Sequence, residues 1–374
     1  MTKKALVLFM IAFMFFCLLS SAVAGESLET TLNGKINLYN ESVVPLADLN
    51  QTLVITVNTS KTLYNVGEEV ETNGTLFLVV YNQSFPIPGQ LIALQINDRA
   101  GNFAYRTLET APGVSPQQWQ INVSRAYIGD SAGNPFASVT KGQLVYTWLT
   151  YNNDWNQLLH VMAAYTVVDA NNVRLYSLAP VEWDLQPGQN VTIRSAWSVP
   201  SYAASGSAKL IASAFSGPPS SGGFPYCPER SSSFTVASSA YSASTSSQVL
   251  DTLIQQNGTY VTYAELSKKV DVSIPSGTRI GNYTVYVSAK YGDQLRANAT
   301  TTFQVRLLGD VDGVQNPSSG TYSVNILDAI KIAQAFGSQL GSPNWNPKAD
   351  FNGDNRVNIL DAIILSANFG NYAL

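Results

Sequence analysis

The 374-residue chain is mildly acidic, with a formal net charge of −4 and only 12% charged residues. It contains no basic run, and this argues against binding to nucleic acid or to an anionic membrane surface. A single histidine and two cysteines make His-based catalytic triads and His/Cys metal sites poor explanations for this protein.

Residues 1–24 have the pattern of a secretory signal peptide. Lys3 and Lys4 give a positive start, residues 5–19 are apolar, and residues 22–24 offer small side chains for cleavage. The apolar stretch is shorter than the roughly 20 residues that a membrane span needs. We therefore expect a secreted protein, associated with the cell surface, whose mature chain has no membrane span.

Residues 51–305 have the character of β-structure throughout. Short runs of β-branched and aromatic residues are broken at regular intervals by turn residues, as at 98–102 and 169–172. No long helical period appears before residue 325. The pattern predicts β-sandwiches rather than a parallel sheet. Ten Asn-X-Ser/Thr sequons lie between Asn40 and Asn298, so we expect a glycoprotein if the host modifies such sites.

The predicted fold is mostly β, with tandem immunoglobulin-like β-sandwiches followed by a small α-helical module. We divide the mature chain into an N-terminal linker (25–49), sandwich 1 (50–120), sandwich 2 (121–236), a Ser/Ala-rich linker (237–247), sandwich 3 (248–306) and a C-terminal module (307–374). Through residues 64–70 and 88–90, sandwich 1 resembles macroglobulin-type or carboxypeptidase-regulatory-like folds. Through residues 141–142 and 185–188, sandwich 2 resembles adhesion-type domains of bacterial and archaeal surface proteins.

Candidate catalytic groups in the body are few. Glu182 with Asp184, and Glu69 with Glu71, each share one strand face at i, i+2 spacing. Paired acids could hydrolyse glycosides, but two acids on one face are ordinary for a solvated strand. We expect His160 to be an ordinary strand residue and the protein not to be an enzyme.

The remaining candidates in the body are a thiol and an aromatic group. Cys227 is the only cysteine after the predicted cleavage site, so we expect a free thiol without a function. An aromatic set could stack on sugars, or it could fill a sandwich core, and we expect the core role. Its members are Tyr146, Trp148, Tyr151 and Trp155.

The last part of the chain carries one acidic segment twice. Residues 324–330 and 357–363 are identical in sequence, at an offset of 33 residues. Apolar residues at helical spacing follow each acidic loop, which predicts one helix from about Ile326 to Phe336 and a second ending before Gly370.

The second acidic loop matches a calcium loop position by position. Such a loop supplies oxygens at positions 1, 3, 5, 7, 9 and 12, with the backbone carbonyl used at position 7. The corresponding residues are Asp350, Asn352, Asp354, Arg356, Asn358 and Asp361. Position 6 is Asn355, which tolerates a left-handed backbone better than most residues.

The first acidic loop is seven residues longer than the second. Asp310 and Asp312 begin it, and Asn325 and Asp328 end it, but residues 314–323 intervene. Its position-5 ligand therefore cannot be assigned. Together, the two loops predict two Ca²⁺ sites.

This repeat resembles the dockerin module, which has two calcium loop–helix units. The resemblance covers residues 307–371 and implies docking to a cohesin-like domain of a surface or scaffold protein through helix residues just after each loop. The implied docking residues are Ile326, Leu327, Ala333 and Gln334 in one copy, and Ile359, Leu360, Ser366 and Ala367 in the other. The apolar Ile-Leu pairs depart from the polar pair common in dockerins, so they could also pack inside the module or on a neighbouring domain.

Three functional hypotheses follow from the sequence. The main one is a non-enzymatic stalk or adhesive body that is coupled to a cohesin-like partner through calcium. The second is a carbohydrate-binding or polysaccharide-degrading component of a cellulosome-like assembly, whose retention on polysaccharide would depend on Trp148. The third makes the repeat an intramolecular calcium clip on the last sandwich.

Overall fold

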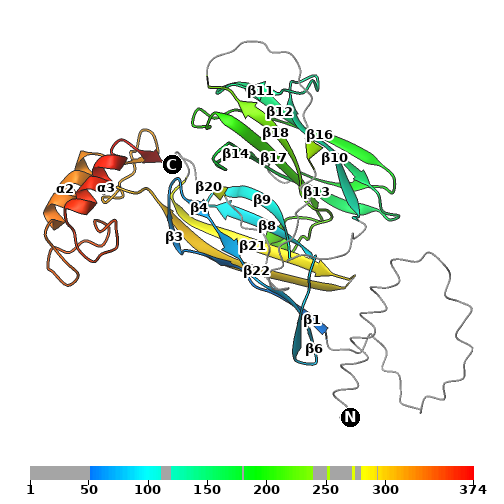
Figure 1. The fold of residues 1–374 in the computed structure, drawn as a ribbon, viewed down its shortest axis with the longest axis horizontal. Helices are drawn as coiled ribbons and strands as arrows, with labels where there is room; N and C mark the ends of the chain where they lie inside the picture. The colour runs from blue at the N-terminus through cyan, green and yellow to red at the C-terminus, as the bar shows by residue number, and fades with distance from the viewer. Residues whose placement is uncertain are drawn as a thin grey trace, which may run out of the picture. The chain divides into compact units, whose positions relative to one another are not determined.

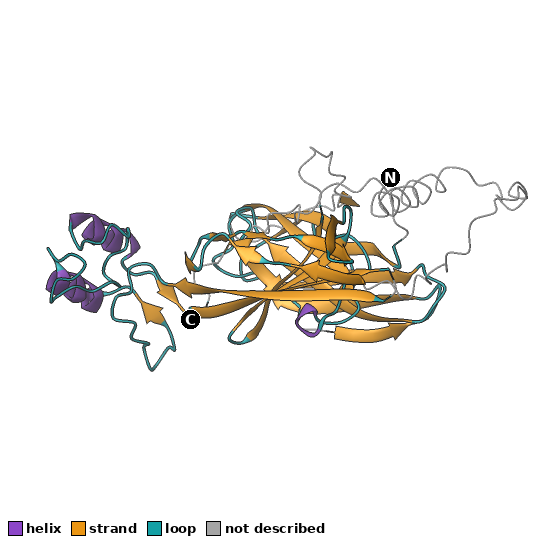
Figure 2. Ribbon diagram, turned by 90° about the horizontal axis from the view of Figure 1, so that it is seen from below, coloured by secondary structure: helices purple, strands orange, loops and turns teal. Residues whose placement is uncertain are grey.

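The computed structural model describes residues 51–110, 119–178, 181–238, 251–252, 272–273, 279–292 and 294–374. Most of these residues lie in β-strands, as predicted, and the two α-helices of the described part lie together near the C-terminus (Figures 1 and 2). The predicted signal peptide and N-terminal linker, and most of the Ser/Ala-rich linker, fall outside the described residues.

The first sheet pair consists of a three-stranded and a five-stranded sheet, in the orders β1-β6-β7 and β3-β22-β21-β8-β9. The strands of the smaller sheet are β1 (Gln51–Ile55), β6 (Leu76–Val80) and β7 (Gln83–Pro86). Those of the larger sheet are β3 (Leu63–Asn65), β8 (Leu91–Asp98), β9 (Gly101–Glu109), β21 (Gly281–Tyr291) and β22 (Leu295–Arg306). Two short ladders join β2 (Asn58–Thr59) to β5 (Thr72–Asn73) and β20 (Val272–Ser273) to β4 (Glu69–Val70).

The described strands do not fit a separate sandwich over residues 248–306. Strand β21 pairs with β8, with Val287 opposite Leu94, and β22 runs parallel to β3. Phe303 and Val287 belong to the same buried cluster as Leu94 and Leu53. A two-stranded hairpin alone is at best marginally stable in water, and β21 and β22 instead complete a sheet begun more than 180 residues earlier. Residues 121–236 are therefore inserted between strands of one sheet.

The second sheet pair is built from this insertion. One sheet has the order β10-β12-β16, and the other has the order β11-β18-β17-β13-β14, with β15 also pairing with β13 and β19 with β18. The strands are β10 (Ile121–Gly129), β11 (Ser138–Val139), β12 (Leu144–Asn153), β13 (Leu159–Val168), β14 (Arg174–Ser177), β15 (Val181–Leu185), β16 (Asn190–Ser198), β17 (Gly206–Phe215), β18 (Arg230–Val236) and β19 (Asp251–Thr252). A short 3-10 helix, η2 (Pro219–Ser221), follows β17.

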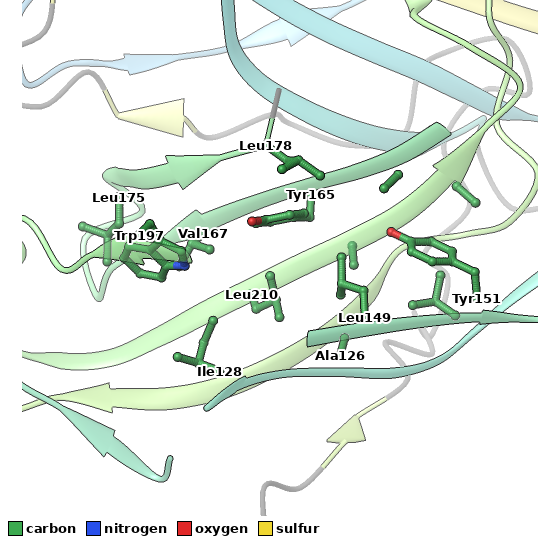
Figure 3. Packing of buried hydrophobic residues seen from close by; sticks show 14 of the residues in the cluster. Ala126, Ile128, Leu149, Tyr151, Tyr165, Val167, Leu175, Leu178, Trp197 and Leu210 are labelled. Carbon is green, nitrogen blue, oxygen red and sulfur yellow. The ribbon is translucent and has the colours of Figure 1, made fainter. Parts of the chain in front are cut away.

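Alternating side chains of the two sheets form the core of the second pair. Leu149 and Tyr151 of β12 face the core, together with Trp197 of β16 and Tyr165 of β13 (Figure 3). Val145 of β12 belongs to the same buried cluster. The period-2 alternation that predicted strands is thus also the alternation between buried and solvent-facing side chains.

The larger sheets of the two pairs pack against each other. A small cluster that contains Ala93 and Tyr105 from the first pair and Met162, Ala164 and Phe215 from the second is almost fully buried. Strands β8 and β13 are consequently buried on both faces. This explains why residues 91–96 and 161–168 are largely apolar rather than alternating, with Gln95 and Thr166 as the polar exceptions.

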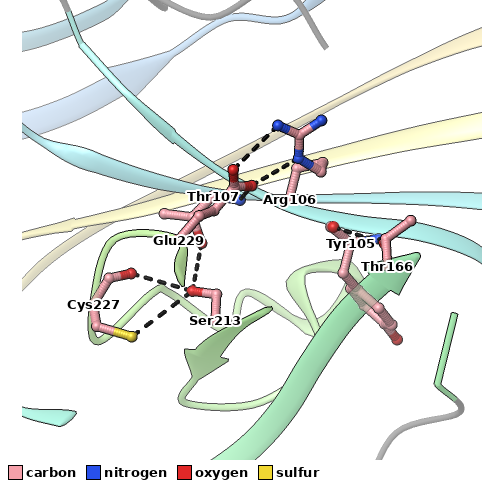
Figure 4. A network of polar contacts seen from close by, with 7 residues as sticks. All are labelled: Tyr105, Arg106, Thr107, Thr166, Ser213, Cys227 and Glu229. Carbon is pink, nitrogen blue, oxygen red and sulfur yellow. Dashed lines mark hydrogen bonds and ion pairs between the residues drawn. The ribbon is translucent and has the colours of Figure 1, made fainter. Parts of the chain in front are cut away.

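Polar groups cross the same interface and are paired (Figure 4). Arg106 Nε donates to Glu229 Oε1 at 2.7 Å, and the same oxygen accepts from the backbone N of Thr107, also at 2.7 Å. Thr107 Oγ1 donates to Ser213 Oγ at 2.6 Å. Thr166 Oγ1 accepts from the backbone N of Tyr105 and donates to the carbonyl of the same residue, both at 2.9 Å. These hydrogen bonds fix the position of the two packed sheets relative to each other.

We predict that Glu229→Ala destabilises the chain by about 3–5 kcal/mol, because the Arg106 charge is left largely buried without its partner. The side chains of Arg106 and Glu229 are 13% and 3% exposed. Denaturant unfolding followed by circular dichroism measures the effect. Lys61→Ala, which breaks the exposed pair with Glu68, is the control and should cost less than about 1 kcal/mol. Equal losses in the two variants would contradict the proposed role of this ion pair.

Candidate metal centre

The C-terminal module has its own small core beside the two acidic loops. Val324, Ile332, Phe351, Val357 and Leu365 form its centre, and other buried residues complete it. Helix α2 (Ile326–Ala335) follows the first loop and α3 (Ile359–Asn368) follows the second. The two helices therefore begin where the duplicated sequence predicts, and each ends before a glycine with positive φ, Gly337 or Gly370.

Each helix begins with a capping box built from two residues of its loop. Asn325 Oδ1 accepts from Leu327 N at 2.8 Å, and Asp328 Oδ2 accepts from Asn325 N, also at 2.8 Å. Asn358 and Asp361 make the equivalent bonds in the second copy. A capping box satisfies backbone N–H groups that the helix itself leaves unpaired.

The first loop brings three carboxylates together. One oxygen from each of Asp310, Asp312 and Asp328 lies within 4.8 Å of the others. Asp328 is fully buried, and its Oδ1 accepts from the backbone N of Val311 at 2.7 Å and of Asp312 at 3.0 Å. Burial, together with the charges of Asp328 and Asp312, raises the pKa of Asp310 to about 6. Three acids held this close repel one another unless a cation or a proton lies between them.

Asp312 also carries a buried oxygen that lacks a partner. Its Oδ2 is inaccessible to solvent and makes no hydrogen bond within the described part of the chain. A buried carboxylate oxygen is costly to leave unpaired, so this atom fits a bound cation. Oxygen-only ligands suit hard cations such as Ca²⁺ or Mg²⁺ rather than zinc or copper.

The extra residues of the first loop have a structural use. Within them, β23 (Tyr322–Ser323) pairs with the C-terminal strand β24 (Tyr372–Ala373). The loop thus reaches the end of the second repeat and ties the two copies together. Asn325, which the sequence assigns as a ligand, uses its Oδ1 as the helix cap and donates through Nδ2 to the carbonyl of Ser323.

In the second loop, backbone N–H groups hold the carboxylate oxygens of Asp350 and Asp361. Asp350 is buried, and its Oδ1 and Oδ2 accept from the backbone N of Gly353 and Asn355 at 2.9 and 3.0 Å. Asp361 Oδ1 accepts from Phe351 N at 2.8 Å. Asn355 has φ +63°, the left-handed conformation expected at position 6.

The two loops differ in how their oxygens are arranged. Asp354, Asn352 and Asn358 are linked side chain to side chain, with Asn352 Nδ2 and Asn358 Nδ2 both donating to Asp354 Oδ2. Among the described residues, the close cluster of three carboxylates forms in the first loop. The second loop combines carboxylates with amide oxygens. Arg356, whose carbonyl is the position-7 candidate, is exposed, and its N donates to Asp354 Oδ1.

All eight residues that the dockerin resemblance marks for docking are exposed. Ile326 and Ile359 are 63% and 61% exposed, and Leu327 and Leu360 are about half exposed. The remaining four, Ala333, Gln334, Ser366 and Ala367, are also exposed. The Ile-Leu pairs therefore do not pack inside the module, and each copy presents the same apolar pair to solvent.

The predicted core role of the aromatic set in β12 is wrong for Tyr146 and Trp148. These two side chains lie on the face opposite Val145 and Leu149, and Trp148 Nε1 donates to the carbonyl of Asp130. The tryptophan in the core is Trp197 of the neighbouring strand β16. Tyr151 is buried, as predicted. Local sequence gave no sign of which of two alternating faces would be covered.

The acidic pairs of the body lie on the surface. His160 Nε2 lies 2.9 Å from Glu182 Oε2, and its Nδ1 lies 2.8 Å from Asp184 Oδ1, on paired strands β13 and β15. Glu69 is exposed and Glu71 is half-buried, and both lie beside the short ladders of β4 and β5. Cys227 is buried, and burial raises the pKa of its thiol to about 11, which leaves it unreactive at neutral pH.

Comparisons with known proteins leave the family open. No protein-family model and no curated protein matches the chain. Among solved structures, the C-terminal domain of wzt covers 41% of this chain and 92% of its own, with 15% identity and a TM-score of 0.27. The DNA-bound alkylpurine DNA glycosylase AlkC of Pseudomonas fluorescens covers 32% of this chain at 9% identity and a TM-score of 0.23. A Listeria innocua β-glucosidase bound to glucose covers 33%, with 10% identity and a TM-score of 0.22.

These similarities are too weak to carry an argument about function. The match spans 30% of the glycosylase and 16% of the β-glucosidase, so it concerns parts of those proteins. In the described residues, no helix is long and apolar enough to cross a membrane.

We predict a pH-dependent contribution from the His160 cluster. Hydrogen bonds to Glu182 and then Asp184 raise the pKa of His160 above its usual value. The stabilisation is fully present below about pH 6.5 and is lost as the pH rises through the raised pKa. His160→Gln should therefore lower the melting temperature at pH 5.5 and have a smaller effect at pH 8.5. A larger loss at pH 8.5 would contradict this assignment.

Proposed function

We propose that the chain is an exported, non-enzymatic modular protein whose C-terminal module, residues 307–374, binds calcium and docks a cohesin-like domain of a surface partner. The body would act as a stalk or adhesive unit. The observation that carries the proposal is the duplication itself: two acidic loops, each capping a helix that presents an exposed Ile-Leu pair. Solvated turns alone do not account for two copies with matching caps and matching exposed residues.

Calcium would act on the start of each helix. The bound ion would neutralise the repulsion among Asp310, Asp312 and Asp328, whose closeness is unfavourable without a cation. Asp328 links the loop to α2 because it accepts from both Val311 and Asn325. Loading the loop would therefore fix the position of Ile326 and Leu327, the first exposed residues of the helix.

We predict that calcium stabilises the mature chain and that Asp350→Ala removes most of the effect at the second site. With a Kd near 10 µM, 1 mM calcium contributes about 2.7 kcal/mol per site. Melting curves with calcium and with chelator measure it, and Gln334→Ala, an exposed position on α2, is the control. Asp312→Ala should act in the same way at the first site. If the Asp350 variant melts at the wild-type temperature in calcium, the second site is misassigned.

We predict that charge on the exposed helix pairs abolishes docking without unfolding the module. Ile326→Arg combined with Ile359→Arg alters both copies, since either helix could serve. Binding to a panel of recombinant cohesin domains should require calcium and fall at least tenfold in the double variant. Leu340→Arg is the matched control, because Leu340 is 65% exposed and lies outside both helices and both acidic loops. Absence of calcium-dependent binding to any cohesin in the panel would count against docking.

The calcium-clip hypothesis has its own support. Val66 and Ile280 of the body pack against the module core, and Ile280 N donates to the carbonyl of Leu374 at 2.8 Å. A fragment that begins at residue 248 would leave β21 without β8, so the useful comparison is between residues 307–374 and 50–374. Calcium titration of both by calorimetry separates the two proposals. An autonomous module binds calcium as the isolated fragment 307–374. A clip binds calcium only in the longer fragment, in which it is joined to the body.

A further inference from the structure

A second candidate site lies far from the acidic loops in sequence, where the two sheet pairs meet. It is a pocket of about 270 Å³. Its walls come from the start of β8, from residues 119–120 before β10, from the β12–β13 turn, from the segment before β18 and from the β21–β22 turn. The pocket therefore exists only because the inserted sheet pair packs on the first.

Aromatic rings form much of the wall. Trp119, Trp155, Tyr226 and Tyr291 all contribute, together with Phe224. Phe224 meets Tyr226 edge to face, with ring centroids 5.4 Å apart. The cations of Lys290 and Arg296 lie 5.1 and 5.0 Å from the centroid of the Phe224 ring. These contacts hold the Phe224 ring in place, while the tryptophans remain partly exposed.

Neutral polar groups accompany the rings. The side-chain amides of Gln90 and Gln120 and the hydroxyls of Tyr226 and Tyr291 line the pocket, and none makes a hydrogen bond to another described residue. Burial raises the pKa of Tyr226 to about 12, so its hydroxyl stays protonated and can donate. No carboxylate lines the pocket, and its charged lining residue, Lys290, holds its ammonium over the Phe224 ring.

We propose that this pocket binds a neutral sugar unit of a glycan. The C–H face of a pyranose ring packs on an aromatic ring, while its hydroxyls need donors and acceptors around the edge. A wholly apolar ligand would displace water from the amides and hydroxyls without replacing its hydrogen bonds. The lack of a carboxylate and the presence of Lys290 argue against an amine. Aromatic walls with a few placed polar groups are typical of small-molecule sites. The proposal is independent of calcium loading and docking.

The outer face of β10 and β12, with Tyr127, Tyr146 and Trp148, is a weaker sugar site. Trp148 Nε1 already donates to the carbonyl of Asp130, and the Tyr127 hydroxyl donates to that of Gly133. Arg194 lies over the ring of Trp148, 5.6 Å from its centroid, and donates to the carbonyl of Ser131. The polar groups that would recognise a sugar there are engaged, which makes Trp148 a suitable control position.

The test is titration of the mature full chain with cellotetraose, xylotetraose and mannotetraose, with tetragalacturonate as the acidic comparison. Calorimetry and tryptophan fluorescence give the affinities. We expect saturable binding of at least one neutral tetrasaccharide, unchanged by chelator. Trp155→Ala should weaken it at least tenfold, and Trp148→Ala should change it by less than twofold. The unchanged affinity in chelator separates this result from the outcome of the calcium experiments.

Because Trp155 also packs against the second core, a gentler variant is needed. Gln90→Ala combined with Gln120→Ala removes two amides from the pocket without removing a ring. We expect this double variant to melt near the wild-type temperature and to bind several-fold more weakly. Binding of tetragalacturonate alone, of no oligosaccharide, or with full affinity in the double variant would overturn the proposal, as would a loss confined to Trp148→Ala.

Discussion

The pairing of β21 with β8 is the constraint on which the rest of the structure depends. It joins strands that are separated by the whole inserted sheet pair, and it places Val287 and Leu94 in one core. Closing so long a segment costs conformational entropy, although the cost grows only slowly with length. The buried apolar surface of β8, β13 and β17 offsets it. Because the chain leaves the first pair after β9 and rejoins it at β20 and β21, the insertion is held against the larger sheet of the first pair.

Because the two larger sheets pack face to face, the polar groups buried between them need hydrogen-bond partners. Thr107 and Ser213 bond to each other, and Ser213 also donates to the carbonyl of Cys227 at 3.1 Å. Ser288 of β21 donates to the carbonyl of Gly223. Each of these groups would be costly if left alone in a buried interface. The same residues bring the segment around 224–226 to the pocket wall, so the interface that stabilises the body also shapes this pocket.

The sequence predicted local features well because they depend on local physics. The helix starts at Ile326 and Ile359, the glycine stops and the left-handed Asn355 follow from spacing, capping and backbone conformation within a few residues. The β-strands of the body were likewise predicted from local runs of β-branched and aromatic residues between turns. The separate third sandwich was a wrong prediction, because alternation identifies a strand but carries no information about its partner.

Other features of the site could not be predicted for the same reason. Trp148 and Trp197 look alike in sequence, and only the packing of the neighbouring sheets decides which one is covered. The sequence already grouped Asp310, Asp312 and Asp328 in one loop, and the structure brings their oxygens together. The position-5 ligand was hidden by the extra residues of that loop. The use of those residues appears only when β23 meets β24, at the other end of the repeat. The pocket likewise draws on five separate segments of the chain.

The placement of β22 has a mechanical consequence. Its last residue, Arg306, leads directly into the module at Leu307, and along its length it pairs antiparallel with β21 and, near its end, parallel with β3. A pull on the module therefore acts along the strand. It loads the hydrogen bonds to β21 and β3 in shear, many at once, rather than peeling them apart one by one. The ladders on both sides of β22 would therefore resist a pull applied at Leu307.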